Sequence, residues 1–416
     1  MASKQAPRLF SVPHCPRVSP LTGRLISLLL SLLLVSVSLA PTRAAEEDFA
    51  TWLAGLRAEA EADGVRPATL DRALAGVEPI PRVIELDRQQ PESTITYEGY
   101  LRFALKPERM KAAREHFRDN RAALAEVGRR FGVQPRFIVA LWGIETGFGK
   151  ITGRFPVIAA LATLAYDGRR STFFRNELIA ALRIADEGKI DPQEMLGSWA
   201  GAMGQSQFMP SSYLRFAVSY RGNGHGDIWH STEDVLASIA NYLHKFGWQA
   251  GMPWGFEVVA PKGFDYRASR GTFQEWANRG FKRADGSALP RTGEAILFFP
   301  SGAAGPAFLI TGNFVVIKQY NNSDAYALAV GELSDRIHGL GPIRAPWPEN
   351  DFQLSRSERI ALQRKLADLG YKVSEFNGHL DFDLRDNIRE MEQRFGMIAD
   401  GYPSRALLER MGIRAP

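Results

Sequence analysis

Residues 137–149 read Phe-Ile-Val-Ala-Leu-Trp-Gly-Ile-Glu-Thr-Gly-Phe-Gly. This run predicts an apolar helix that ends at glycine and carries one carboxylate, Glu145, near its C-terminal end. Ile138, Leu141 and Trp142 share the helix face of Glu145, so burial and the negative end of the helix dipole should both raise the pKa of its carboxyl. A carboxylic acid that stays neutral at working pH suits a glycosidic general acid. The alternative is a structural Glu that pairs with a buried arginine or lies on the surface.

A second informative segment, residues 198–213, reads Ser-Trp-Ala-Gly-Ala-Met-Gly-Gln-Ser-Gln-Phe-Met-Pro-Ser-Ser-Tyr. Small residues alternate with amide, hydroxyl and aromatic groups. Such a loop can place backbone donors, Ser198 and Gln207 against a polar ligand. Phe208 and Tyr213 are candidates for stacking on sugar rings. The alternative is a tight packing site between two helices.

The overall composition is that of a globular protein. The chain has 416 residues, of which 45% are hydrophobic and 23% charged, so wholesale disorder and a multi-span membrane protein are excluded. A single cysteine excludes an internal disulfide framework and a Cys-rich metal site. The net charge of +5 comes from residues 1–44, which contain five basic residues and no acid. The rest is formally neutral, which argues against a nucleic-acid surface.

The N-terminus has the pattern of a secretory signal. Arg8, Arg17 and Arg24 precede an uncharged run, residues 25–40, and small residues follow. This run is shorter than a bilayer span, so we expect cleavage after residue 44 or 45 rather than an uncleaved anchor. Cys15 precedes the apolar run, where it cannot serve as a lipid attachment site after cleavage.

The remaining chain is predicted to be α+β and mainly α, with a small β-rich insert. Hydrophobic spacing and proline or glycine boundaries predict helices, and short β-branched or aromatic runs predict strands. The expected helices include residues 136–146, 155–164, 170–186, 233–246 and 325–337; the expected strands are residues 257–260, 295–299, 307–310 and 314–317.

Several motifs together resemble the membrane-bound lytic murein transglycosylase B family, in family order from about residue 49 to residue 340. They are Trp-Gly-x-Glu-Thr at 142–146, Ala-Leu-Ala-Thr-Leu-Ala-Tyr at 160–166, Arg169-Arg170 with Phe173-Phe174, Ala-Gly-Ala-Met-Gly-x-x-Gln-Phe-Met-Pro-Ser-Ser-Tyr at 200–213, Asn241-Tyr242-Leu, Asn313-Phe, Tyr320-Asn321 and Tyr326. The missing lipid-attachment cysteine distinguishes this chain from lipid-anchored members.

The resemblance implies a lysozyme-like catalytic domain that cleaves the β-1,4 bond from N-acetylmuramic acid (MurNAc) to N-acetylglucosamine (GlcNAc) in peptidoglycan. The family's single catalytic glutamate maps onto Glu145, which would protonate the leaving oxygen and then deprotonate the muramoyl C6 hydroxyl. The product would be a 1,6-anhydromuropeptide. An ordinary glycosidase needs a second carboxylate, whereas a substrate that supplies its own nucleophile does not.

The same resemblance assigns substrate-binding residues. Ser198 and Gln207 would contact N-acetyl and hydroxyl groups, and Arg169 and Arg170 would meet the carboxylates of the peptide arm. A solvated basic pair is the alternative for the two arginines. The remaining candidates, which would line the cleft, are Phe208, Tyr242, Tyr320, Asn321, Tyr326 and, from a less distinctive stretch, Tyr100.

The stretch at residues 219–233 resembles a damaged calcium loop. Ser219 and Arg221 stand where calcium needs carboxylates, so we expect no tight calcium site, although Asn223, Asp227 and Glu233 leave weak binding open. No zinc-ligand spacing or phosphate-binding loop is present in the sequence. We therefore expect no metal and no cofactor.

The C-terminal residues form the last predicted domain. Residues 1–44 are interpreted as the signal peptide, 45–340 as the catalytic domain, 341–351 as a Pro-rich linker, and 352–416 as a small three-helix domain. The last of these resembles a peptidoglycan-binding domain. Asn377, Leu384 and Glu392 depart from the usual Asp, Thr and Gln, which puts its ligand affinity in question; the alternative is a structural cap on the catalytic domain.

The sequence therefore predicts an exported, periplasmic, non-lipidated peptidoglycan lytic transglycosylase. Two alternatives stay open: a hydrolytic muramidase and a non-catalytic peptidoglycan-binding scaffold. We expect a monomer whose partner is the glycan strand, with other cell-wall enzymes as further candidates and no nucleic acid.

Overall fold

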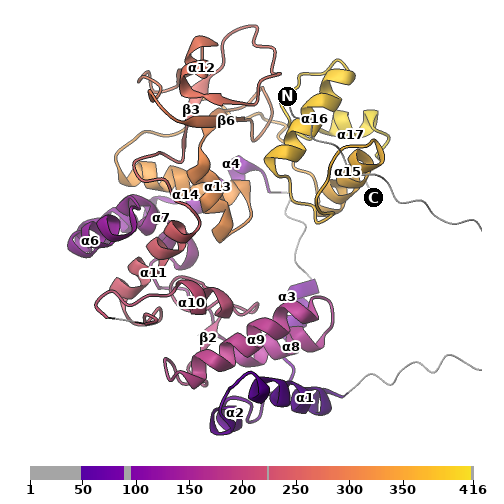
Figure 1. Cartoon of the computed structure of the whole chain (residues 1–416). Helices are drawn as coiled ribbons and strands as arrows, with labels where there is room; N and C mark the ends of the chain where they lie inside the picture. Colours follow the sequence, from indigo (N-terminus) through magenta and orange to yellow (C-terminus); the bar gives the residue numbers. More distant parts are fainter. Residues whose placement is uncertain (1–47, 89–94, 223, 414–416) are drawn as a thin grey trace, which may run out of the picture. The chain divides into compact units, whose positions relative to one another are not determined.

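The structure, a computed structural model, describes residues 48–88, 95–222 and 224–413, whose helices and strands are labelled in Figure 1. The predicted signal sequence, including Cys15 and the cleavage site, lies outside the described residues, and so does Asn223 of the calcium-loop stretch. No helix in the described part of the chain combines the length and the apolarity needed to cross a membrane.

Helices dominate the fold, which confirms the mainly α prediction. Those before the larger sheet are α1 (Phe49–Ala62), α2 (Pro67–Ala73), α3 (Pro81–Arg88), α4 (Tyr97–Ala104), α5 (Pro107–Asp119), α6 (Arg121–Phe131), α7 (Pro135–Thr146), α8 (Val157–Tyr166), α9 (Ser171–Asp186), α10 (Pro210–Phe216) and α11 (Thr232–Lys245). Within and after that sheet come α12 (Phe273–Asn278), α13 (Gly312–Tyr320), α14 (Asp324–Ile337), α15 (Arg356–Asp368), α16 (Phe382–Arg394) and α17 (Arg405–Arg410).

Helix α7 is the centre of the main hydrophobic core. It begins at Pro135, whose fixed φ suits the first helical position, and it ends at Gly147 in the left-handed region, with φ 57°. Eight of its 12 residues are buried, and they pack against α5, α6, α11 and α14. A helix that is apolar on nearly every side must be surrounded by other helices, and this packing fixes the direction of its C-terminal end.

The β-rich insert is a five-stranded antiparallel sheet with strand order β4-β6-β7-β3-β5. Its central strands are in register through Glu257↔Phe308 and Leu297↔Leu309, and Phe273 and Trp276 of α12 are fully buried in a core of its own. A separate pair, β1 (Phe155–Pro156) with β2 (Leu196–Gly197), connects the start of α8 to the loop before α10. The strands of the larger sheet are β3 (Gly255–Val259), β4 (Arg270–Thr272), β5 (Lys282–Arg283), β6 (Glu294–Phe298) and β7 (Ala307–Ile310).

The strand predicted at residues 314–317 is wrong, because this segment lies within α13. Thr311 caps the helix by accepting a hydrogen bond from the backbone N–H of Asn313 at 3.2 Å. Phe314 and Ile317, three residues apart, are then both buried on one helix face. A short β-branched run fits either period, and here the cap and the tertiary contacts select the helix.

The three C-terminal helices enclose their own core, which includes Leu362, Ile388 and Leu407. Two of the three unusual residues lie in the interior of this region: Leu384 is buried, and Glu392, also buried, accepts a hydrogen bond from the Gly401 N–H at 2.8 Å. The third, Asn377, is half-buried and accepts a hydrogen bond from the His379 N–H at 2.8 Å. Burial raises the pKa of Glu392 to about 9, which keeps this carboxyl neutral near pH 7. Protonated Glu392 thus resembles the glutamine that is usual at this position.

Candidate active site

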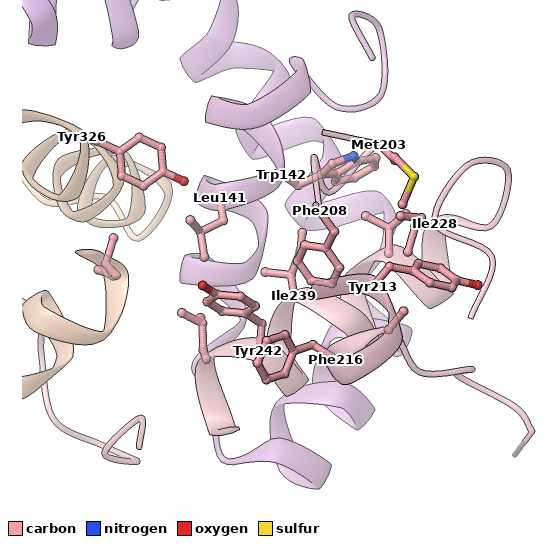
Figure 2. Close-up of a cluster of buried hydrophobic side chains, with 14 of the residues drawn as sticks. Leu141, Trp142, Met203, Phe208, Tyr213, Phe216, Ile228, Ile239, Tyr242 and Tyr326 are labelled. Carbon is pink, nitrogen blue, oxygen red and sulfur yellow. The ribbon is translucent and has the colours of Figure 1, made fainter. Parts of the chain in front are cut away.

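Glu145 is the penultimate residue of α7 and is half-buried. Its Oε1 accepts a hydrogen bond from the hydroxyl of Tyr326, a buried residue in the first turn of α14. Figure 2 shows the Tyr326 ring directed toward the helix that carries Leu141 and Trp142, which is α7. Burial raises the pKa of Glu145 to about 7, and the Tyr326 hydrogen bond partly opposes that rise because it favours the charged form.

Four tyrosines from four helices interact electrostatically with this carboxyl: Tyr100 of α4, Tyr242 of α11, Tyr320 of α13 and Tyr326 of α14. Burial raises the pKa of each phenol, and the negative charge of Glu145 adds to the rise in all four. The pKa of Tyr242 reaches about 12. The structure therefore brings these predicted residues into one electrostatic environment with Glu145.

Hydrogen bonds and ring contacts fix two of the tyrosines further. Tyr320 donates to the Ser206 carbonyl at 2.7 Å, and Tyr242 donates to the Gln319 carbonyl at 2.5 Å. The Tyr242 and Tyr320 rings lie 4.7 Å apart between centroids. These contacts connect the loop before α10, helix α11 and helix α13 beside the carboxyl of Glu145.

The loop formed by residues 198–209 folds back on itself. Ser198 Oγ accepts a hydrogen bond from the Ala202 N–H at 3.0 Å, and Gln207 adopts a left-handed backbone with φ 51°. The Gln207 side-chain amide donates to the Thr152 and Gly204 carbonyls at 2.9 and 3.0 Å. Both hydrogens of this amide are thus engaged, and the acceptor Oε1 is the atom suited to a ligand N–H or hydroxyl.

The two rings predicted to stack on sugars, Phe208 and Tyr213, are not available for this role. Phe208 is 2% exposed and Tyr213 is fully buried. Phe208 packs against Tyr242 and Tyr320, with ring centroids 5.6 and 5.8 Å apart. Both rings lie inside the cluster of Figure 2, where Phe208 supports the site tyrosines and Tyr213 packs against His225 and Trp229, with ring centroids 5.3 Å apart in each pair.

Arg169 and Arg170 bind a buried carboxylate rather than forming a solvated pair. Arg169 Nε lies 2.8 Å from Asp87 Oδ2, and Arg170 Nη2 lies 2.8 Å from Asp87 Oδ1. Asp87 belongs to α3 and is 2% exposed. The two arginines therefore attach α3 to the loop between α8 and α9, while about half of each side chain stays exposed.

Asn321 follows Tyr320 at the end of α13 and is exposed. Together with Tyr100, it lines a cavity of about 460 Å³ whose other wall is formed by residues of the C-terminal region, among them Arg359 and His379. Of the predicted site residues, these two face this cavity.

Sequence reasoning missed the contacts that attach the 198–209 loop to α7. Thr146 Oγ1 donates to the Gln205 carbonyl at 2.8 Å and accepts from the Gly149 N–H at 3.0 Å, and Trp142 Nε1 donates to Gln205 Oε1 at 3.1 Å. A Cβ atom at Gly149, which has φ 80°, would lie 2.5 Å from Gln205 Oε1. This glycine therefore allows the loop to approach the end of α7 closely.

The stretch that resembles a calcium loop is held by internal contacts. Asp234 accepts from the Tyr220 and Asp227 N–H groups at 2.7 and 2.8 Å, and Arg221 lies 3.4 Å from Glu233. Nowhere in the described residues do three or more His, Cys, Asp or Glu side chains form a group that could hold a metal ion.

Comparison with protein families matches both parts of the chain. Residues 48–335 match the transglycosylase SLT domain, and residues 355–411 match the putative peptidoglycan binding domain. The Escherichia coli (strain K12) membrane-bound lytic murein transglycosylase B is 34% identical over 221 residues, which are 52% of this chain and 60% of that protein. The match therefore spans less than two thirds of that relative.

Solved structures are similar over longer stretches. SltB3 from Pseudomonas aeruginosa, in complex with NAG-NAM-pentapeptide, is 45% identical with a TM-score of 0.81; the match covers 88% of this chain and 100% of that chain. The Escherichia coli lytic transglycosylase Slt35, in complex with calcium, is 28% identical with a TM-score of 0.59, over 71% of this chain and 94% of that chain.

The contact between Thr146 and Gln205 predicts a measurable loss of stability. Thr146→Val keeps the side-chain shape but leaves the part-buried Gln205 carbonyl and Gly149 N–H without this partner. We expect the free energy of unfolding to fall by about 1–3 kcal/mol in urea denaturation. The matched control is Thr51→Val, which removes an exposed hydroxyl contact to Asp48 and should cost less than about 0.5 kcal/mol. Equal losses in the two variants would contradict the role of Thr146.

Proposed function

Because the chain belongs to the transglycosylase SLT domain family, we propose that it is a lytic transglycosylase that cleaves the MurNAc–GlcNAc β-1,4 bond of peptidoglycan without consuming water. The observation that carries this proposal is Glu145, a half-buried acid whose pKa is about 7. Among the described residues, burial and the hydrogen bond from Tyr326 shift this pKa. No second carboxylate contributes to the shift.

One carboxyl group can perform both proton transfers of such a reaction. Protonated Glu145 donates its proton to the glycosidic oxygen as the bond from this oxygen to the muramoyl C1 breaks. The resulting carboxylate accepts the proton of the muramoyl C6 hydroxyl, whose oxygen forms a bond to C1 and closes the 1,6-anhydro ring. Glu145 is protonated again at the end, so the reaction consumes no water and needs no second carboxylate.

A pKa near neutrality suits these two roles. A carboxyl at its usual pKa would be ionised at pH 7 and could not donate, whereas a far higher pKa would oppose formation of the carboxylate that acts as base. Burial supplies the upward shift, and Tyr326 stabilises the carboxylate once the proton has left.

The other residues are proposed to bind the sugars. Ser198 and Gln207 Oε1 would bind N-acetyl and hydroxyl groups, and the residues proposed to line the cleft are Tyr100, Tyr242, Tyr320, Asn321 and Tyr326. For Arg169 and Arg170, the bonds to Asp87 favour a structural role over contact with the peptide arm. Phe208 is proposed to support the tyrosines rather than touch the substrate.

We further propose that the protein acts in the periplasm as a monomer, after export by a cleaved signal peptide and without lipid attachment. The basic residues and the apolar run of residues 1–44 support export. The match of residues 355–411 to a peptidoglycan-binding family supports a role for this part in holding the cell wall.

The products of peptidoglycan digestion test the proposed function directly. Mass spectrometry should find 1,6-anhydromuropeptides with the wild-type protein, and Glu145→Gln should lower their rate of formation at least about 1,000-fold because the amide cannot donate the proton. Reducing-end products would indicate a hydrolytic muramidase. Absence of products, with protein that still sediments with peptidoglycan, would indicate a binding scaffold.

The pH dependence tests the role of Tyr326. Glu145 must begin protonated, so kcat should be high below its pKa and should fall as pH rises through about 7. Tyr326→Phe removes a bond that lowers the pKa of Glu145. In this variant we expect a lower maximal kcat, by about 10-fold, and a decline that begins at higher pH. Tyr220→Phe, whose hydroxyl contacts the distant Glu126, is the control and should leave the profile unchanged. A decline at lower pH in Tyr326→Phe would refute the assignment.

A further inference from the structure

A buried ion pair connects the C-terminal helices to the helix that carries Tyr326. Arg385 of α16 is 4% exposed, and its Nη2 lies 2.8 Å from Oδ2 of Asp324. Asp324 is the first residue of α14 and is 9% exposed. Its other oxygen, Oδ1, lies 2.7 Å from Lys318 Nζ on α13. The carboxylate is thus shared between two cations from different parts of the chain.

The position of Asp324 connects this pair to the catalytic acid. Tyr326, two residues further along the first turn of α14, donates the hydrogen bond to Glu145. A helix turn is rigid once its backbone hydrogen bonds form, so a contact that fixes Asp324 also fixes the direction in which Tyr326 leaves the helix. Arg385 is therefore linked to Glu145 by two contacts at the first turn of α14: its own ion pair with Asp324, and the hydrogen bond from Tyr326 to Glu145.

Arg385 also contacts the start of a second helix of the site. Its Nη2 lies 3.5 Å from the hydroxyl of Tyr97, the first residue of α4, and Tyr100 lies three residues further along that helix. One guanidinium thus contacts the first residues of both α4 and α14. In the first turn of each helix lies a tyrosine that interacts with Glu145: Tyr100 electrostatically, and Tyr326 through its hydrogen bond. A planar group with several fixed donors is suited to such a junction.

Other contacts fix the C-terminal helices against the rest of the chain. Arg389 Nη2 donates to the Leu297 carbonyl at 2.9 Å, and Asp400 Oδ2 accepts from the Ala303 N–H at 2.7 Å. The Phe382 ring packs edge-on against Phe298, with centroids 5.9 Å apart. Because these contacts are buried, the C-terminal part is docked rather than held by a flexible tether.

From these contacts we propose that Arg385 is a positioning residue for the catalytic acid. It pairs with Asp324 to hold the first turn of α14, so that Tyr326 keeps its hydrogen bond to Glu145. The C-terminal domain is then part of the catalytic unit, in addition to any contact it makes with the cell wall. The proposal rests on the proposed function, because it assigns Arg385 a role in the reaction of Glu145.

A positioning role differs in its kinetics from a general structural role or a substrate-binding role. If Arg385 orients the acid, its loss should lower kcat and leave KM nearly unchanged, because substrate contacts remain. If the C-terminal domain contributes only affinity for the glycan, KM should rise instead. A short soluble peptidoglycan glycan fragment keeps wall adsorption out of the measurement.

The first test compares Arg385→Gln with a matched control in the purified protein. Arg270→Gln removes another ion pair to α16, through Asp383 and Asp386, but this pair is exposed and touches neither α4 nor α14. We expect Arg385→Gln to lower kcat about 5- to 10-fold, no more than the loss expected for Tyr326→Phe, with KM within about twofold of wild type, and Arg270→Gln to match wild type. An unchanged kcat in Arg385→Gln, or an effect on KM alone, would overturn the proposal.

A double-mutant cycle tests whether Arg385 acts through Tyr326. In the Tyr326→Phe background the hydrogen bond to Glu145 is already absent, so adding Arg385→Gln should lower kcat by no more than about threefold. Losses that multiply in the double variant would show that Arg385 acts independently of Tyr326 and would refute the inference.

If circular dichroism and thermal unfolding show that Arg385→Gln does not fold, two further variants test the same ion pair. Asp324→Asn breaks the same pair from the other side and should give the same loss of kcat. Arg385→Lys keeps the charge, but its ammonium cannot span both helix starts, so kcat should fall about three- to fivefold. Wild-type kcat in either folded variant would contradict the role of Arg385. The wild-type protein is assayed beside each variant. If it forms anhydromuropeptides, the proposed function holds, and a variant with wild-type kcat then contradicts the role of Arg385 alone.

Discussion

The burial of one carboxyl at the end of α7 is the constraint on which the rest of the structure depends. Helix α7 is apolar on almost every side, so other helices must surround it, and its C-terminal turn brings Glu145 to the edge of that core. Burial disfavours the charged carboxylate, so the pKa of Glu145 rises to about 7. The hydroxyl of Tyr326 donates a hydrogen bond that stabilises the carboxylate when it forms.

The surrounding elements preserve this environment from several directions. The 198–209 loop is attached to α7 through Thr146, Gln205 and the space left by Gly149. Tyrosines from α11 and α13 bond to backbone carbonyls rather than to Glu145, so they enclose the site without supplying a second charge. The acid is therefore kept in a preorganised and largely desolvated setting, where its protonation state is set by burial.

The sequence predicted the features of the site that local chemistry determines. Pro135 and Gly147 bound α7, and the apolar neighbours of Glu145 indicated its raised pKa before any fold was known. Tertiary contacts determined what it could not predict: the inward direction of Phe208 and Tyr213, and the helix at residues 314–317. Nor does periodicity reveal long-range ion pairs, such as those of Asp87 with Arg169 and Arg170 or of Asp324 with Arg385.

A pKa near 7 means that Glu145 is a neutral acid in a large fraction of molecules at pH 7. The most direct measurement is a ¹³C NMR titration of protein labelled at the glutamate side-chain carboxyl, in which the Glu145 signal is identified by its absence from Glu145→Gln. We expect a midpoint near pH 7 for this one signal. A midpoint near the ordinary glutamate value of about 4.3 would contradict it, because Glu145 would then be ionised at neutral pH and unable to act as the acid.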